Sequence, residues 1–85
     1  MTGATEPEDT LDRVEHAYHR LSAMLQYLPE ADRLLVADAY HAAREAHNGQ
    51  NRKSGEPYIC HPLAIAQTLA QMRMDAASLA TALLH

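Results

Sequence analysis

The sequence predicts an all-α protein of four helices, and three observations point to this class. Apolar residues recur at every third or fourth position over most of the chain, which places them on one face of an α-helix. No segment shows the strict alternation of apolar and polar residues that is typical of a half-buried strand. Pro29, Asn48-Gly49 and Pro62 interrupt the pattern at points where one helix ends or the next begins.

The first helix is expected to begin at Thr10, a residue type that caps helices, after a disordered tail at residues 1–9. Its apolar stripe comprises Leu11, Val14, Tyr18, Leu21, Leu25 and Leu28. The second helix is expected over residues 30–47, because Pro29 suits the first turn of a helix and Gly49 stops one. One side of this helix carries Leu35, Ala39, Ala42, Ala43 and Ala46, with Tyr40 near the edge.

Two shorter helices follow. Pro62 opens the third, and Asp75 caps the fourth, which runs over residues 76–85. The inward face of the third helix comprises Leu63, Ala66, Leu69 and Ala70. The fourth reaches the last residue with its apolar positions still running and with no Gly, Asn or basic last turn. We therefore expect the N-terminal portion of a larger helical domain, truncated within the fourth helix.

Matched helix lengths bring two histidines together. The third and fourth helices have about eleven and about ten residues, so each is roughly 15–16 Å long. The link at residues 73–75 is short, which favours antiparallel packing. One helix running out and a similar one returning would place His85 beside His61, at the end that carries the loop 49–62, "GQNRKSGEPYICHP". We therefore expect the loop and both histidines to form one site.

Composition limits the classes of function. The chain has 85 residues and a formal net charge of −4, so bulk attraction to nucleic acid or to an anionic membrane is not expected. No apolar run approaches the length of a membrane span, and the acidic start is unlike a signal peptide. The single cysteine, Cys60, cannot form an internal disulfide, which fits a reducing compartment. These features predict a cytoplasmic protein that binds neither nucleic acid nor membrane.

Two adjacent cations in the loop indicate local anion binding. Arg52 and Lys53 are flanked by Gly49, Ser54 and Gly55. Glycine lets a backbone approach a ligand closely, and an arginine can grip a phosphate with two hydrogen bonds. The simpler alternative is a solvated charge pair. The glycine spacing matches neither the P-loop nor the dinucleotide-binding fingerprint.

The histidines and the cysteine also have simpler interpretations. His61 and His85 suit Mn, Fe or Zn in a mixed set with carboxylates, but each alone would be a residue at a helix end. A catalytic metal site usually has at least three protein ligands, so further ligands would come from beyond residue 85. Cys60 is expected to pack and not to act as a nucleophile. The other histidines are expected at helix surfaces (His16, His19 and His41) or at a helix end (His47).

Residues 43–85 resemble the start of the hydrolase domain of the RelA/SpoT family, whose members make and degrade the alarmone (p)ppGpp. The resemblance rests on the pattern AH-x-GQ-x-RKSGEPYI-x-HP, followed by LLH at the end of the chain. It extends more loosely to "YLPEAD" at residues 27–32 and covers about two thirds of the chain.

The resemblance implies a role for each matching residue. His61 matches the first metal-binding histidine of the family, and His85 matches the histidine of its His-Asp dyad. Arg52, Lys53 and Ser54 match the loop that contacts the guanine base and the phosphates. The family uses Mn²⁺ to activate a water that attacks the 3′ pyrophosphate. The Asp of the dyad and the later acidic residues of the family would lie past residue 85, so we assign no catalytic residue within the chain.

Three functions remain open at this point. The first is a fragment of a metal-dependent guanosine-3′,5′-bis(diphosphate) 3′-pyrophosphohydrolase that degrades guanosine tetra- and pentaphosphate in the stringent response, with the chain itself inactive. The second is a non-catalytic regulatory HD-like module of a (p)ppGpp synthetase. The third is another HD-type nucleotide phosphohydrolase. An Asp directly after His85, with a Glu-Asp pair shortly beyond it, would favour the first.

Overall fold

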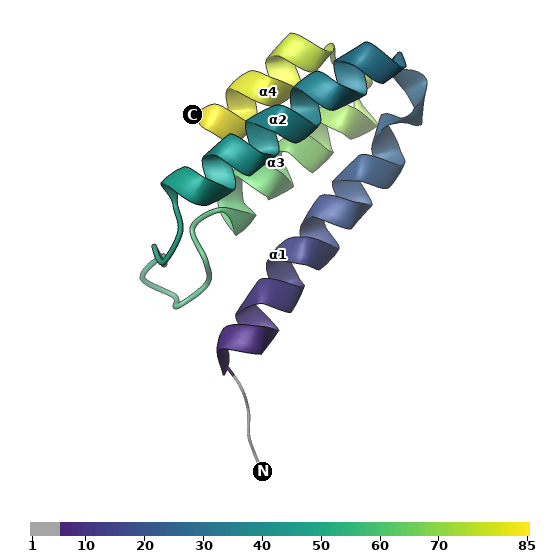
Figure 1. Ribbon diagram of the computed structural model, residues 1–85. Helices are drawn as coiled ribbons and strands as arrows, with labels where there is room; N and C mark the ends of the chain where they lie inside the picture. The colour runs from purple at the N-terminus through teal and green to yellow at the C-terminus, as the bar shows by residue number, and fades with distance from the viewer. Residues whose placement is uncertain (1–5) are drawn as a thin grey trace.

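The computed structural model describes the backbone of residues 6–85 and the side chains from residue 13 onward. Within this range the chain forms four α-helices and no strand, as predicted (Figure 1). The helices are α1 (Glu6–Ala23), α2 (Glu30–Ala46), α3 (Cys60–Gln71) and α4 (Ala76–Leu84), with a 3₁₀ turn, η1 (Met24–Tyr27), after α1. None of the helices described here has the length and hydropathy that crossing a membrane requires.

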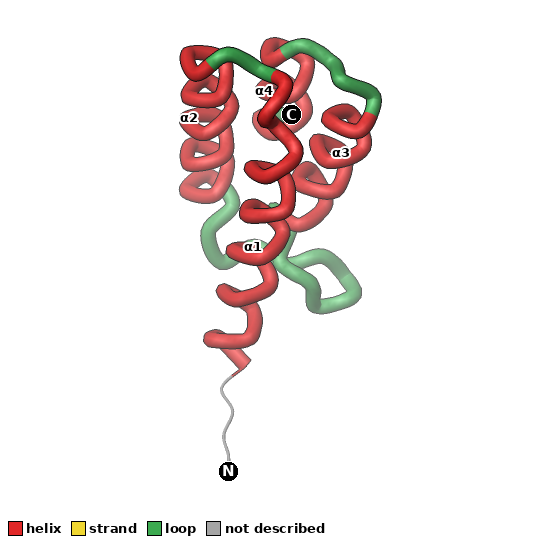
Figure 2. Tube along the Cα trace, turned by 90° about the vertical axis from the view of Figure 1, so that its right-hand side faces the viewer, coloured by secondary structure: helices red, strands yellow, loops and turns green. Residues whose placement is uncertain are grey.

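The helices pack so that three of their ends meet. α3 and α4 are antiparallel neighbours, as predicted, and α2 lies alongside α4 (Figures 1 and 2). α1 packs on α3, where Gln67 Nε2 donates a hydrogen bond to the carbonyl oxygen of Ala17 (2.9 Å). The C-terminal ends of α2 and α4 and the start of α3 therefore lie at one end of the bundle, the loop end (residues 47–61 and His85). The opposite end, the turn end, comprises residues 24–29 and 72–75.

The core lies among the four helices and contains one aromatic stack. Tyr40 is fully buried, and its ring stacks on that of Tyr18 with the ring centroids 3.9 Å apart. This contact joins α1 to α2, as does the ion pair between Arg44 of α2 and Glu15 of α1. Burial raises the pKa of both phenols, with nearby Glu15 as a further cause, so both stay neutral at ordinary pH. The largest fully buried aliphatic side chains are Leu21, Val36, Leu63, Leu79 and Leu83.

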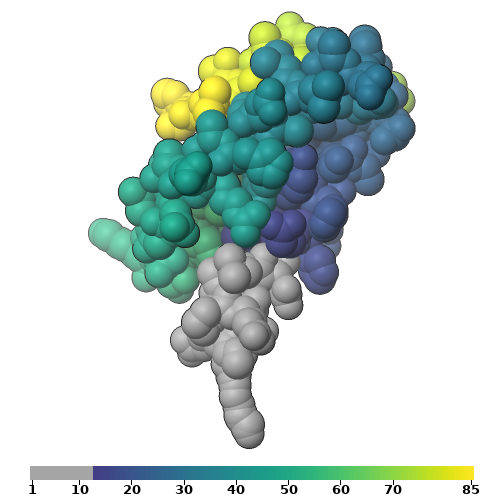
Figure 3. Space-filling model, in the orientation of Figure 1, coloured from purple at the N-terminus to yellow at the C-terminus, as the bar shows by residue number. Residues whose placement is uncertain are grey.

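The apolar side predicted for α2 is only partly the buried one, because Ala39 and Ala43 are buried but the other three residues are not. Leu35 is 47% exposed, and Ala42 and Ala46 are also exposed. The buried residues of this helix are Val36, Ala39, Tyr40 and Ala43. In an alanine-rich helix the apolar stripe is weakly defined, and the two largest side chains, Val36 and Tyr40, decide which face is buried. The opposite face of α2 lies at the molecular surface in Figure 3.

The predicted helix boundaries differ from the observed ones at two helix starts and at one helix end. The predicted stripe of the first helix ran to Leu28, whereas the α-helix ends at Ala23 and the chain continues as the 3₁₀ turn η1. α1 begins at Glu6, so residues 6–9 are helical instead of part of a tail, and Thr10 lies inside the helix. Pro7 and the acidic residues around it suit a first helical turn, which explains the earlier start. The expectation for residues 1–5 and the packing of Leu11 lie outside what the structure describes. α3 begins at Cys60, two residues before the predicted Pro62.

The turn between α3 and α4 is held by a helix-ending motif that normally contains glycine. The backbone N–H of Met74 donates to the carbonyl oxygen of Leu69 (3.1 Å). The backbone N–H of Arg73 donates to the carbonyl oxygen of Ala70 (2.9 Å). Arg73 occupies the left-handed position of this motif with φ +56°. Asp75 then caps α4, as predicted.

The cap of α4 is a side-chain hydrogen bond. Asp75 Oδ1 accepts a hydrogen bond from the backbone N–H of Ser78 (2.9 Å). The hydrogen bonds from Ser78 lower the pKa of the Asp75 carboxyl, which therefore stays charged at the positive end of the helix.

Candidate functional site

The loop between α2 and α3, residues 47–59, is closed at its base by its own backbone. The N–H of Tyr58 donates to the carbonyl oxygen of Gln50 (2.9 Å). One residue further out on each side, Asn51 and Pro57 form an isolated antiparallel bridge. Pro57 and the residue after Tyr58 are buried, so the returning half of the loop is anchored on the bundle.

The tip of the loop is a tight turn that carries the predicted cations. The N–H of Arg52 donates to the carbonyl oxygen of Glu56 (2.8 Å). The N–H of Gly55 donates to the carbonyl oxygen of Arg52 (2.8 Å). Gly55 has φ +92°, a conformation that side chains disfavour, so a glycine is needed to close this turn. The turn leaves Arg52, Lys53 and Ser54 exposed to solvent.

The two predicted histidines face a common hollow. His61 lies in the first turn of α3, and His85 directly follows α4. Both side chains line a concavity of about 370 Å³ between these helices, the histidine hollow. The convergence expected from the helix lengths is therefore confirmed. The rest of its lining is mostly apolar: Tyr58, Pro62, Ile65, Leu69, Ser78, Thr81 and Ala82.

A second concavity, the loop hollow, lies beside the first. It measures about 530 Å³ and is lined by Asn51, Arg52, Lys53, Ser54 and Tyr58. Tyr58 lines both hollows. Arg52 Nη1 also lies 3.4 Å from His61 Nδ1, so a side chain from the tip reaches the first turn of α3. The structure thus brings the basic tip and the two histidines together at the loop end, as the sequence predicted.

Comparison with known proteins identifies the family. The family model described as HD domain matches residues 39–85, which include the loop and both histidines. The chain belongs to the HD domain family.

This HD domain is also similar to individual curated proteins. It is 48% identical over 71 residues to the bifunctional (p)ppGpp synthase/hydrolase SpoT of Escherichia coli, and the matched segment covers 82% of the chain. It is 52% identical over 60 residues to a guanosine-3′,5′-bis(diphosphate) 3′-pyrophosphohydrolase of Vibrio cholerae, covering 71% of the chain. A GTP pyrophosphokinase of Myxococcus xanthus is 47% identical over 60 residues, also 71% of the chain. The matched segment makes up only 10% of the SpoT protein and 8% of each of the other two.

Two imidazoles of the HD domain lie at the histidine hollow, where a metal could be held. His61 and His85 are exposed imidazoles on one hollow, and imidazole suits the common divalent transition metals. Among the residues that the structure describes, no three or more His, Cys, Asp or Glu side chains gather closely enough to hold an ion. The two histidines therefore fit a metal in chemistry, but they do not complete its ligand set.

Cys60 sits next to His61 in the HD domain, yet it has no feature of a nucleophile. Its side chain is half-buried against the core and lines neither hollow. Burial raises the pKa of the Cys60 thiol, the nearby Glu56 raises it further, and only Arg13 lowers it. The thiol is therefore protonated at neutral pH, which agrees with the predicted packing role.

His47 is the residue whose role sequence reasoning missed. We expected a helix-end residue near the last carbonyls of α2, and its backbone does follow that helix directly. Its side chain, however, turns to the loop, where Nδ1 lies 2.9 Å from Gln50 Oε1 and the ring lies against that of Tyr58. The signal was available in the AH-x-GQ part of the pattern, which contains both His47 and Gln50. The remaining helix histidines, His16, His19 and His41, are exposed as predicted.

Proposed function

We propose that the complete protein containing this chain is a metal-dependent (p)ppGpp 3′-pyrophosphohydrolase. In this proposal His61 and His85 are two ligands of a Mn²⁺ ion, and Arg52, Lys53 and Ser54 contact the nucleotide. The observation that carries the proposal is the placement of both histidines on one hollow that shares Tyr58 with the hollow of the basic tip. Similarity to curated proteins named as (p)ppGpp hydrolases supports the choice of substrate.

In this proposal the residues of the histidine hollow hold the metal, and those of the loop hollow contact the nucleotide. A bound divalent cation supplies an activated water and neutralises phosphate charge. Arg52 and Lys53 add two positive charges at the tip of a chain whose formal net charge is −4, so a highly anionic nucleotide is attracted locally. Ser54 offers a hydroxyl beside them, which can donate to a phosphate or base oxygen.

A second function is a non-catalytic HD module of a (p)ppGpp synthetase. The similarity to a Myxococcus xanthus protein named GTP pyrophosphokinase favours this alternative. The module would keep Arg52 and Lys53 for nucleotide binding but lack turnover. A third possibility, an HD-type phosphohydrolase for another nucleotide, differs only in substrate. For all three we propose a cytoplasmic location, which the lone Cys60 supports.

Hydrolysis by the complete protein tests the proposal. Purified protein, stripped of metal with a chelator and reloaded with Mn²⁺, should release pyrophosphate from guanosine tetraphosphate, whereas the stripped protein should not. The isolated chain of 85 residues should neither hydrolyse the nucleotide nor hold Mn²⁺ tightly, because two imidazoles lack the carboxylates that such a site needs. Nucleotide binding without turnover by the reloaded complete protein would favour the regulatory module, and turnover of a different nucleotide would favour the third possibility.

A further inference from the structure

Tyr58 lies where the two hollows meet. Its side chain lines the histidine hollow with His61 and His85, and it lines the loop hollow with Arg52 and Lys53. A ligand that fills both hollows must contact this ring, because Tyr58 lines both of them. The position of the ring therefore helps to set how such a ligand lies in the site.

The backbone of Tyr58 is fixed on both sides. Its N–H donates to the carbonyl oxygen of Gln50 (2.9 Å), which ties it to the outgoing half of the loop. Its own carbonyl oxygen accepts a hydrogen bond from the N–H of His61 (3.0 Å), which ties it to the first turn of α3. The main chain at Tyr58 has little freedom, so the remaining freedom belongs to the ring.

The ring of Tyr58 rests on the ring of His47. The two ring centroids are 4.5 Å apart with an angle of 33° between the planes. His47 is held in turn by Gln50, whose Oε1 lies 2.9 Å from His47 Nδ1. Gln50 thus contacts the backbone of Tyr58 and the side chain of His47 at once. His47 itself lines neither hollow, so any effect it has on a ligand is indirect, and its ring partner Tyr58 lines both hollows.

We propose that His47 is a positioning residue, held by Gln50, that fixes the ring of Tyr58 at the boundary between the two hollows. The ligand class is an anionic nucleotide long enough to contact both the basic tip and the histidines. This inference rests on the proposed function for its kinetic test, but not for its structural test. His47 supports binding geometry and takes no part in holding metal or moving protons.

The kinetic test compares three variants of the complete Mn²⁺-loaded protein with guanosine tetraphosphate as substrate. His47→Ala should raise KM about three- to ten-fold, because an aromatic pair is lost, while kcat and metal content stay near the wild-type values. His47→Phe keeps a flat ring against Tyr58 and should restore most of the affinity. His16→Ala, an exposed histidine on α1, is the matched control and should leave KM unchanged.

A double-mutant cycle decides whether His47 acts through Tyr58. On a Tyr58→Ala background, His47→Ala should have no further effect on KM, because the ring that it positions is already absent. Full additivity of the two substitutions would overturn the inference. So would a KM for His47→Phe that is no better than that for His47→Ala, or a loss of metal content in both.

Motion of the Tyr58 ring gives a readout that does not depend on the substrate. In NMR spectra of the complete protein without ligand, His47→Ala should speed the rotation of the Tyr58 ring, because the ring on which it rests is lost, and His47→Phe should speed it less. Unchanged motion of the Tyr58 ring in His47→Ala would overturn the inference even if hydrolysis is confirmed. If the wild-type protein fails to hydrolyse guanosine tetraphosphate but the ring behaves as expected, the proposed function fails and the positioning of Tyr58 by His47 stands.

Discussion

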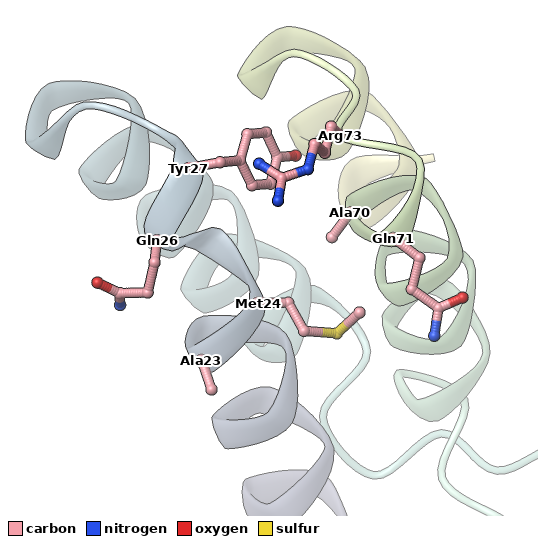
Figure 4. Close-up of a pocket in the computed structure, with 7 residues that line it drawn as sticks. All are labelled: Ala23, Met24, Gln26, Tyr27, Ala70, Gln71 and Arg73. Carbon is pink, nitrogen blue, oxygen red and sulfur yellow. The ribbon is translucent and has the colours of Figure 1, made fainter.

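Both ends of the bundle carry a surface hollow with an arginine and a tyrosine, but the two ends use these residues differently. At the turn end the hollow measures about 530 Å³ and includes Tyr27 and Arg73, which lie close together in Figure 4. The hydroxyl of Tyr27 donates to the carbonyl oxygen of Met74 (2.6 Å). The guanidinium of Arg73 lies over the Tyr27 ring, 5.5 Å from its centroid. These polar groups therefore serve to fasten η1 to the α3–α4 turn.

At the loop end the corresponding residues face other functional groups. Tyr58 is held through its ring by His47 and lines two hollows, and Arg52 reaches His61 from an exposed turn. In Figure 4 the two glutamines of the turn-end hollow, Gln26 and Gln71, point away from each other. The size of a hollow thus says little about function. What distinguishes the loop end is that the exposed side chains of His61 and His85 converge there with those of Arg52 and Lys53.

The largest expected effect follows from removing a proposed metal ligand at the loop end. In the complete protein, His61→Ala should lower metal content and reduce (p)ppGpp hydrolysis by more than roughly a hundred-fold, even at saturating substrate. The size follows because removing a group that merely orients a ligand already costs about 10–100-fold. Metal analysis and steady-state hydrolysis measure both effects. Normal metal content and activity in His61→Ala would show that His61 is not a metal ligand, and the loop end would then be no more functional than the turn end.

A smaller effect with a different kinetic signature is expected at the loop tip. Arg52→Ala should raise KM by roughly ten- to a hundred-fold with metal content unchanged, because a charge-assisted contact contributes about 1.5–3 kcal/mol. Lys53→Ala should do the same to a lesser degree, since an ammonium lacks the planar fork of a guanidinium. Cys60→Ser, next to His61, is the matched control and should leave KM and metal content nearly unchanged. If the kinetics of Arg52→Ala and Lys53→Ala both equal those of wild type, the tip is only a solvated loop.

At the turn end we expect substitutions to lower the free energy of unfolding and to leave the hydrolysis rate unchanged. Tyr27→Phe removes the hydrogen bond to Met74 but keeps the ring under Arg73, so it should lower the free energy of unfolding by about 1 kcal/mol. Urea unfolding of the chain measures this, and Tyr58→Phe is the control, because the ring contact with His47 does not involve the hydroxyl. A change in hydrolysis by the Tyr27→Phe complete protein would mean that the turn end is coupled to the site.

The sequence predicted the features of the two ends that depend on local rules, namely the breaks between helices and the short turn between the last two helices. Asp75, Gly49 and the prolines marked the helices, and the similar lengths expected for two helices around a short turn were enough to predict that His61 and His85 lie together. The buried face of α2 was predicted only in part, at Ala39 and Ala43, because alanines give too little difference between faces. The contact of His47 with Tyr58 was missed because it depends on the path of a thirteen-residue loop, 47–59, which no periodicity describes. The left-handed conformation at residue 73 was missed because an arginine stands where glycine is usual.

The smallest expected effect concerns that arginine. At φ +56° a non-glycine residue costs roughly 1 kcal/mol, whereas glycine adopts this conformation freely. The contact of Arg73 with the Tyr27 ring contributes about 0.5–1 kcal/mol in the other direction. Arg73→Gly should therefore change the free energy of unfolding by less than about 0.5 kcal/mol, because the two contributions nearly cancel. Arg73→Ala loses the ring contact and keeps the strain, so it should be the less stable variant in urea unfolding. Equal destabilisation by glycine and alanine would show that backbone strain at this position is negligible and that the ring contact alone accounts for Arg73.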